Sequence, residues 1–166
     1  MVKVAPGVKS MKVRTYENRD HDSVVKLHML GMEEYGFGRN PAEWDKDLED
    51  ITGTYIKPGG TFLVVEEDGI PIAMGGLERI DDETAEIRRM RVHPDYRRRG
   101  IGSMLVDRLV DFARSRGFKR IILYTTDRQR PAIALYRKKG FRLRDSERLF
   151  YEETGRFTLM TFELRL

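Results

Sequence analysis

The sequence predicts a mixed α/β (α+β) fold in which helices pack on a mostly antiparallel sheet. Two strand-like runs, 61–67 and 70–80, flank the dipeptide Asp68-Gly69, which is a strong hairpin signal. An amphipathic helix separates the next strand, 85–92, from a buried strand at 118–126. The chain ends in strand, turn and strand. Hairpins and helices mixed in this way predict a mixed sheet rather than a doubly wound one.

The earlier elements follow from local signals. A strand at 11–17 precedes a helix that Asp20 or Asp22 caps at its N terminus. The glycine-rich segment 31–41 is predicted to be a loop. A second helix then starts at Pro41, and its apolar stripe consists of Trp44, Leu48 and Ile51.

The later elements complete the order β-α-α-β-β-β-α-β-α-β-β. The helix of about 100–116 is closed by Gly117, and a short helix at 131–139 is followed by Gly140. The last two strands are predicted to pair as antiparallel neighbours around the turn Glu-Glu-Thr-Gly.

Length and composition limit the class of protein. The 166 residues suit one domain, which we place at 11–166, with 1–10 as a loose extension that lacks the apolar segment of a secretory signal. No apolar run reaches the roughly 18 residues of a membrane span. The absence of cysteine, and three histidines without metal-ligand spacing, predict no disulfide and no metal site. A reducing, cytoplasmic location is the default expectation.

The segment 97–103, Arg-Arg-Arg-Gly-Ile-Gly-Ser, is the most informative stretch. It enters a predicted helix, whose first N–H groups are unpaired and carry about half a positive charge. Glycines at 100 and 102 let an anion approach the backbone closely. The spacing matches neither a P-loop nor the full dinucleotide motif. The segment therefore predicts a diphosphate site flanked by arginines, with an ordinary glycine-rich turn as the alternative.

The strand 85–92 contains an irregularity. Its apolar positions Ile87, Met90 and Val92 break the two-residue alternation between 87 and 90. One extra residue near Arg88 or Arg89, a β-bulge, restores the alternation. Such a strand splays from its neighbour and frees backbone groups for an extended ligand. A twisted edge strand is the alternative interpretation.

The charge balance favours an anionic partner. The net charge is +4, and arginines crowd the segment 88–99. Nucleic acid is disfavoured because the aromatic residues of a single-strand platform are missing near Arg97–Arg99. A phosphorylated cofactor fits the glycine-rich segment better.

Two motifs make the chain resemble the GCN5-related N-acetyltransferase (GNAT) superfamily. Arg97 through Gly102 matches its acetyl-CoA signature, [QR]-x-x-G-x-[GA], and follows a strand that ends in Val-His-Pro-Asp-Tyr. Residues 132–141, Ala-Ile-Ala-Leu-Tyr-Arg-Lys-Lys-Gly-Phe, match the A-x-x-L-Y-x-K-x-G-F helix. Both motifs occur in the family's order, and the element order over 11–166 agrees. The resemblance implies the GNAT fold and acetyl-CoA as cosubstrate.

The resemblance also implies cofactor-binding residues. The pantetheine arm of acetyl-CoA would pair with backbone groups of Met90, Arg91 and Val92. The segment that begins at Arg97 would hold the diphosphate on the amides of Arg98, Arg99, Gly100, Ile101, Gly102 and Ser103. Gln129 stands where many relatives carry an asparagine that touches the cofactor.

Glu86 and Tyr136 are the catalytic candidates. An alkyl ammonium must lose a proton before it attacks a thioester. The Ala-Glu-Ile opening of the strand resembles the histone-acetylating branch, which places a basic glutamate there. An ion pair between Glu86 and Arg88 is the structural alternative. The resemblance places Tyr136 near the thioester sulfur as general acid, and its reference pKa of about 10 keeps it protonated. A core tyrosine is the alternative for Tyr136.

The acceptor is the least defined part of the prediction. The resemblance implies that residues 31–40 and 150–155 form the walls of the acceptor site. Its aromatic floor would consist of Tyr35, Phe37, Phe150 and Tyr151. Glu33 or Glu34 would attract a cationic amine. Tyr124 stands where enzymes that acetylate protein N termini often carry glutamate. We therefore expect a small-molecule primary amine as acceptor.

Other readings stay open at this point. A peptide or protein N-acetyltransferase is the alternative enzyme, and a noncatalytic acyl-CoA-binding module is the alternative outside catalysis. The oligomeric state is also open, although homodimers are common among relatives.

Overall fold

The computed structural model describes residues 11–37 and 42–166, except for the side chains of 42–44. The expected extension 1–10 and the expected helix start at Pro41 lie outside these residues. The described residues form a seven-stranded sheet in the order β1-β2-β3-β4-β5-β7-β6. Its strands are β1 (Met11–Thr15), β2 (Thr61–Glu67), β3 (Ile70–Arg79), β4 (Thr84–Val92), β5 (Arg120–Thr126), β6 (Arg142–Tyr151) and β7 (Gly155–Arg165).

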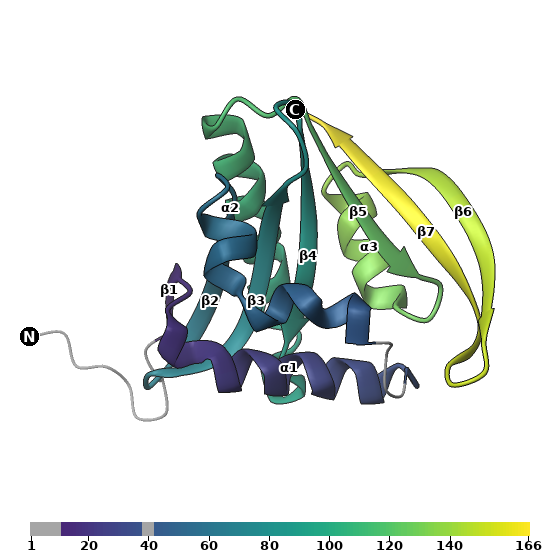
Figure 1. Cartoon of the computed structure of the whole chain (residues 1–166), viewed down its shortest axis with the longest axis horizontal. Coiled ribbons are helices and arrows are strands. Elements are labelled where there is room, and N and C mark those ends of the chain that lie inside the picture. The colour runs from purple at the N-terminus through teal and green to yellow at the C-terminus, as the bar shows by residue number, and fades with distance from the viewer. Residues whose placement is uncertain (1–10, 38–41) are drawn as a thin grey trace, which may run out of the picture.

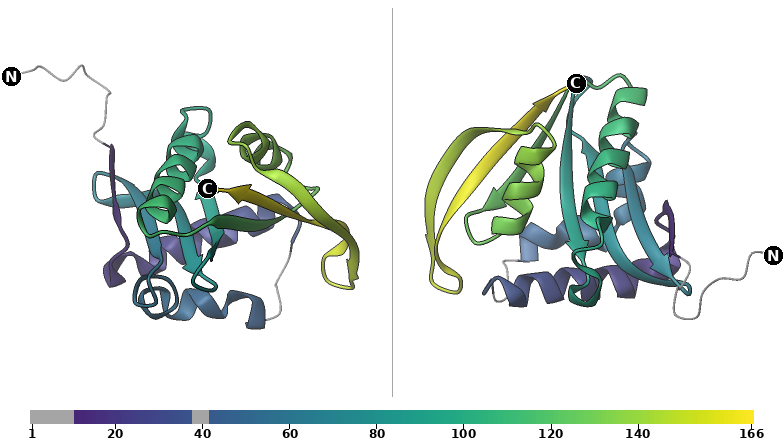
Figure 2. Two further views of the ribbon diagram at one scale, coloured as in Figure 1. Left: turned by 90° about the horizontal axis from the view of Figure 1, so that it is seen from above. Right: turned by 180° about the vertical axis from the view of Figure 1, so that it is seen from behind.

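Helices cover both faces of this sheet. One face carries α1 (His21–Glu34), preceded by η1 (Asn18–Asp20), together with η2 (Ala42–Glu49) and η3 (Thr52–Ile56). The other face carries α2 (Ile101–Ser115), preceded by η4 (Pro94–Tyr96), and α3 (Arg130–Lys138) (Figures 1 and 2). No helix in the described ranges is long and apolar enough to cross a membrane. The mixed α/β prediction is confirmed.

The hairpin between β2 and β3 has the predicted turn. Asp68 and Gly69 both adopt positive φ angles, 51° and 81°. Two consecutive positive φ angles match the twist of the flanking strands, and aspartate and glycine tolerate them best. Glu67 and Ile70 then pair directly across the turn.

The centre of the sheet opens between β4 and β5. These strands run parallel and pair from Thr84 with Arg120 to Ile87 with Leu123. Beyond Ile87 they diverge, as Figure 1 shows for the ends away from the C terminus. The sheet therefore separates into two halves on one side of this contact.

The divergence coincides with the predicted β-bulge in β4. Met74 pairs with Arg91 and Gly76 pairs with Arg88, so Arg89 and Met90 together face the single residue Gly75. Arg89 adopts a φ of 59°, which supplies the local bend. A Cβ atom on Gly75 would lie 2.5 Å from the Met90 sulfur, so glycine makes room for the bulge. The bulge prediction is confirmed.

The main core lies between α2 and the central strands. Leu109 and Ala113 of α2 pack in one cluster with Leu77, Ile87 and Ile121, all nearly or fully buried. Each fully buried leucine or isoleucine contributes about 1.5–3 kcal/mol. This packing fixes the N terminus of α2 beside the opening in the sheet.

Two predictions on the α1 side were wrong. Helix α1 continues to Glu34, past the glycine that was expected to begin a loop. Gly31 is buried against Arg91, and that packing offsets its helix-propensity cost of about 1 kcal/mol. The expected helix 41–51 is instead the 3₁₀ helix η2 followed by the π-helical turn η3, although Leu48, Ile51 and Tyr55 still share one buried cluster.

Candidate active site

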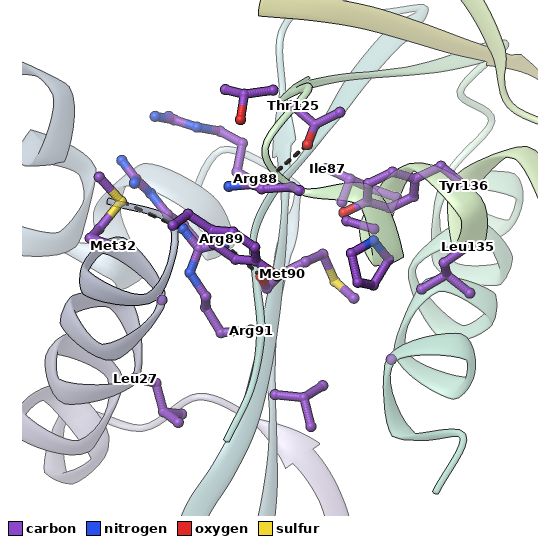
Figure 3. A pocket seen from close by; sticks show the side chains of 18 of the residues that line it. Leu27, Met32, Ile87, Arg88, Arg89, Met90, Arg91, Thr125, Leu135 and Tyr136 are labelled. Carbon is purple, nitrogen blue, oxygen red and sulfur yellow. Dashed lines mark hydrogen bonds between the residues drawn. The ribbon is translucent and has the colours of Figure 1, made fainter. Parts of the chain in front are cut away.

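A cavity of about 1150 Å³ occupies the opening between β4 and β5. Side chains from α1, β4, β5, α3 and the β6–β7 hairpin line it, together with the start of α2 (Figure 3). Its volume is that of a site for a cofactor-sized ligand. Every residue predicted to be catalytic or to bind the cofactor, except Arg99, lines it.

The N terminus of α2 forms one part of this lining. Gly100 caps the helix with a φ of 75°, a left-handed conformation that favours glycine. The first α-helical hydrogen bond runs from Met104 N–H to Gly100 O at 3.0 Å. The N–H groups of Ile101, Gly102 and Ser103 therefore have no helical acceptor.

Both glycines leave space for a ligand at this helix end. A Cβ atom on Gly100 would have no neighbour within 4 Å among the described residues, and one on Gly102 would meet Leu135 at 3.5 Å. The first turn of α2 carries no acidic residue. These features fit a diphosphate group.

The flanking arginines divide into different roles. Arg97 forms an ion pair with Glu34, so the end of α1 is tied to the glycine-rich segment. The hydrogen bonds from Arg97 hold the pKa of Glu34 below its usual value. Arg98 lines the cavity, whereas the Arg99 guanidinium lies 5.2 Å from the centre of the Tyr96 ring, outside the lining. The role predicted for Arg99 belongs to its backbone amide and stays a prediction.

Glu86 lies in the cavity wall with a side chain that is 15% exposed. Its Oε2 atom is 3.2 Å from Arg88 Nε. Burial raises the pKa of Glu86 to about 7, although the Arg88 charge opposes this rise. A carboxylate with this pKa can accept a proton near neutral pH. The ion pair with Arg88 that we considered as an alternative is present and does not remove Glu86 from the cavity.

A buried ionic network supports the bulge from the α1 side. Asp47 accepts hydrogen bonds from Arg89 at 2.6 and 2.9 Å and from the Tyr55 hydroxyl at 2.6 Å. Arg88 contacts Asp47 at 3.5 Å and donates to Glu78 at 2.8 Å. Burial alone would raise the pKa of Asp47, but the bonds from Arg89 hold it below its usual value. This network could not be predicted from the sequence, because its members are far apart in the chain.

Tyr136 lies on the α3 side of the cavity. It is buried, its ring is 5.8 Å from that of Phe141, and its hydroxyl has no hydrogen-bond partner among the described residues. Burial raises the pKa of Tyr136 to about 12, so the hydroxyl keeps its proton. The tyrosine is thus both part of the core and able to donate a proton into the cavity.

Gln129 immediately precedes α3. Its Oε1 atom accepts a hydrogen bond from the Thr125 hydroxyl at 2.7 Å, and both residues line the cavity. This contact restrains the Gln129 side chain within the cavity lining. Thr125 is a lining residue that the sequence analysis did not identify.

The expected acceptor wall is only partly present. Tyr35, Phe37 and Tyr151 line the cavity, and Phe37 packs edge-on against Phe157 at 5.2 Å. Phe150 is 64% exposed, and neither it nor Glu33 contributes to the lining. Glu34 is bound to Arg97, so the acidic attraction expected from residues 33 and 34 is not found in the cavity.

Arg128 is a further residue that sequence reasoning missed. Its guanidinium donates to the carbonyl oxygens of Tyr35 and Gly36 beyond α1, and to those of Thr154 and Arg156 at the β6–β7 turn. The four distances range from 2.6 to 3.3 Å. The same guanidinium lies 4.7 Å from the centre of the Phe37 ring. Arg128 therefore joins the two segments that were expected to form the walls of the acceptor site.

Comparison with known proteins agrees with this geometry. The family model described as "Acetyltransferase (GNAT) family" matches residues 24–141. Human N-acetyltransferase 8 is 35% identical over 102 residues, which cover 58% of this chain and 45% of that protein. The IAA acetyltransferase of Azospirillum brasilense is 38% identical over 122 residues, covering 72% of this chain and 77% of the relative. The chain thus spans less than half of the human protein.

A solved structure extends the likeness to the whole fold. The yncA acetyltransferase from Salmonella typhimurium, solved with its cofactor acetyl-CoA, superposes with a TM-score of 0.75 at 20% identity and covers 94% of each chain. The GNAT family uses acetyl-CoA as cosubstrate, as the sequence motifs implied. With the family model matched over most of its length, the chain belongs to the GNAT acetyltransferase family.

Proposed function

We propose that this protein is an acetyl-CoA-dependent N-acetyltransferase that modifies a primary amine of a small molecule. One observation carries the proposal. A single cavity, opened by the splay of β4 from β5, is lined by the glycine-rich start of α2 and also by Glu86 and Tyr136. An anion-binding helix end, a candidate base and a candidate acid therefore share one space.

The cofactor side uses backbone groups. The N–H groups of Ile101, Gly102 and Ser103 bind the diphosphate, assisted by the helix dipole. On the side of β4 that faces β5, strand pairing ends at Ile87. The backbone of Met90 and Val92 is then available to an extended arm and to the acyl oxygen. A preorganised N–H donor at such an oxygen is worth about 3–4 kcal/mol.

Acetyl-CoA, when bound, supplies an acetyl group activated as a thioester. Glu86 accepts the proton that the ammonium group of the acceptor must lose, and its raised pKa suits this exchange near neutral pH. Tyr136 donates a proton to the departing sulfur, because its own pKa keeps it protonated throughout the neutral range. The bond from the amine nitrogen to the acetyl carbon forms and the bond from that carbon to sulfur breaks. The nitrogen then loses a second proton, which restores the proton that Tyr136 gave to the sulfur, so the products are the N-acetyl amine, the thiol of CoA and one proton held by Glu86.

The walls of the cavity favour a compact acceptor. Arg128 connects the end of α1 to the β6–β7 turn, so that the acceptor side is bounded by Tyr35 and Phe37 on one flank and by Tyr151 on the other. An extended peptide needs an open groove, whereas a small amine fits between such walls. This supports a small-molecule acceptor over a protein.

The test is to incubate a panel of amines with acetyl-CoA and to measure the free thiol of the CoA that is released. We expect CoA release with small primary amines and little with peptides that carry a free N terminus. Tyr136→Phe and Glu86→Gln should lower the turnover while leaving acetyl-CoA affinity intact. Tight acetyl-CoA binding without release by any amine would contradict the enzyme proposal and favour a noncatalytic acyl-CoA-binding module. Preferential acetylation of the peptides would favour the protein-modifying alternative.

A further inference from the structure

Arg91 combines burial with the lack of a carboxylate partner, which sets it apart from the other arginines along the cavity. Three of its neighbours are neutralised by carboxylates within 4.0 Å: Arg88 by Glu78, Glu86 and Asp47, Arg89 by Asp45 and Asp47, and Arg97 by Glu34. Arg98 has no such partner among the described residues, but its side chain is exposed to solvent. Arg91 lines the same cavity, yet no carboxylate of the described residues lies within that distance of it. Its charge is therefore not balanced by a direct partner.

The remaining contacts of Arg91 are weak or incomplete. One terminal nitrogen donates to the Met90 carbonyl oxygen at 3.0 Å, and the other approaches the Met32 sulfur at 3.8 Å (Figure 3). The Nε atom is sealed from solvent and has no hydrogen-bond partner in the described part of the chain. Because a guanidinium carries five N–H donors, most of its bonding capacity is unused.

This arrangement is costly unless an anion completes it. A guanidinium taken out of water without a counter-charge loses solvation that a carbonyl and a thioether do not restore. Burial, reinforced by the charge of Arg89, lowers the pKa of Arg91 from its ordinary value. Arginine nevertheless stays protonated in proteins. The guanidinium thus has no carboxylate in direct contact, and Asp45 attracts it only from a greater distance.

Gly31 of α1 makes the position of Arg91 possible. A Cβ atom at Gly31 would lie 2.4 Å from Arg91 Nε and 2.6 Å from its Cδ. A glycine inside a helix costs about 1 kcal/mol relative to alanine. Here the missing methyl group provides the space in which the guanidinium packs. The pair Gly31 and Arg91 therefore acts as one structural unit.

The direction of Arg91 separates it from the diphosphate site. Met90 and Val92 pack with Ile101 and Leu105 of α2, on the cofactor side of the sheet. Arg91 instead reaches Gly31 and Met32 of α1, on the opposite side. The anion that it lacks is accordingly one that enters from the α1 side, where the acceptor is proposed to bind.

We propose that Arg91 binds a carboxylate of the acceptor, so that the substrate class is amino acids and related amines that carry a carboxylate. The planar guanidinium matches a carboxylate, and charge-assisted bonds between the two are stronger than neutral ones. This inference rests on the proposed function, since it names the acceptor of the same reaction.

The first experiment compares matched amines: amino acids, their primary amides, and the amines that remain after decarboxylation. For the wild type we expect kcat/KM to favour the carboxylate member of a set by about 10- to 100-fold, the range for a bond to a charged group. Arg91→Met should abolish this preference by raising KM for the amino acid, while the Kd of acetyl-CoA stays unchanged. Arg114→Met, in the exposed last turn of α2 and away from the cavity, is the matched control.

A second variant moves the guanidinium without removing it. Gly31→Ala places a methyl group where Arg91 now packs, and we expect it to weaken the preference for carboxylates in the same way. If the wild type prefers the amides, or if Arg91→Met keeps the preference, the carboxylate proposal is overturned although the enzyme proposal survives.

A binding measurement decides the question independently of turnover. Calorimetry in the presence of CoA compares N-acetyl amino acids with their N-acetyl amides. Tighter binding of the carboxylates by the wild type, lost in Arg91→Met, supports the proposal even if no tested amine is acetylated. Equal or absent binding of both overturns it. Failure of all amines to release CoA is, by contrast, evidence against the proposed function itself.

Discussion

Glu86 shows how the surroundings of one residue change its affinity for a proton. Its carboxyl is mostly buried and lies near Glu78 and Asp47, which both disfavour its ionisation. Arg88 compensates only in part, because it also serves Glu78 and Asp47. The result is a group that exchanges its proton near pH 7 instead of near pH 4.5. Two consequences of this are measurable.

The first concerns the rate. Protonated Glu86 cannot accept a proton, so kcat should fall about tenfold per pH unit below a pH of about 7 and level off above it. Glu86→Gln should lose this limb and lower kcat by about 10²- to 10⁴-fold, the usual contribution of a positioned base. The measurement is kcat against pH at saturating amine. A variant with the wild-type rate and profile would show that Glu86 is structural.

The second concerns stability. The unfolded chain ionises Glu86 near pH 4.5, whereas the folded protein keeps the proton to about pH 7. Stability therefore decreases as pH rises through this window, and the deficit is constant above it. Glu86→Gln should be more stable than the wild type at pH 8 by up to about 3 kcal/mol, and equal to it below pH 4.5. Thermal unfolding at both pH values tests this, with exposed Glu49→Gln expected to show no such trend.

Gly102 offers a test in which binding and folding separate. A side chain at this position meets only ordinary contacts, and an acidic residue in the first turn of a helix favours the dipole. Gly102→Glu should therefore fold normally. Its charge occupies the proposed diphosphate position, so we expect acetyl-CoA affinity to fall at least about 100-fold, or about 3 kcal/mol.

Calorimetry with acetyl-CoA provides the readout for Gly102→Glu. Ser115→Glu adds the same charge at the opposite end of α2 and should bind as the wild type does. An unchanged Kd for Gly102→Glu would show that the diphosphate does not bind at the start of α2.

At the scale of elements, the contact between α1 and the β6–β7 hairpin depends on Arg128. Its guanidinium binds four backbone carbonyls from the two segments and stacks on Phe37. A lysine retains the charge but cannot reproduce this planar, forked set of bonds. The clamp therefore depends on shape as much as on charge.

Arg128→Lys should loosen both acceptor walls without disturbing the cofactor side. We expect faster hydrogen exchange in peptides that contain 35–37 and 154–157, and a higher KM for the amine with an unchanged Kd for acetyl-CoA. Arg144→Lys, on the exposed face of β6, is the control and should change neither quantity. Unaltered exchange in Arg128→Lys would mean that the walls are held by other contacts.

At the scale of the whole molecule, the sequence predicted what local signals determine. The Asp68-Gly69 turn, the order of strands and helices and the bulge near Arg89 all follow from short-range chemistry or alternation. The bulge could be predicted because one inserted residue changes which side chains face the core, and this shift breaks the alternation of apolar residues along the strand. The single domain at 11–166 and the roles of the individual site residues stay predictions.

What could not be predicted depends on contacts between distant segments. Arg89 meets Asp47 at a separation of 42 residues, Arg91 meets Met32 at 59, and Arg128 meets Gly36 at 92. No periodicity marks such pairs in one sequence. The glycine in α1 was misread for the same reason, because its partner comes from β4. The low helix propensity of Gly31 favours a loop, whereas its packing against Arg91 stabilises the helix.

The strand order also makes β6 an edge strand of the sheet, and its ten residues are nearly all exposed. A long unpaired edge strand exposes backbone N–H and C=O groups with which other chains can pair, and such pairing leads to aggregation. Half of these ten residues are charged, namely Arg142, Arg144, Asp145, Glu147 and Arg148. Replacing them with neutral side chains would leave an uncharged edge strand that favours fibril growth. These charges therefore help to prevent aggregation at high protein concentration.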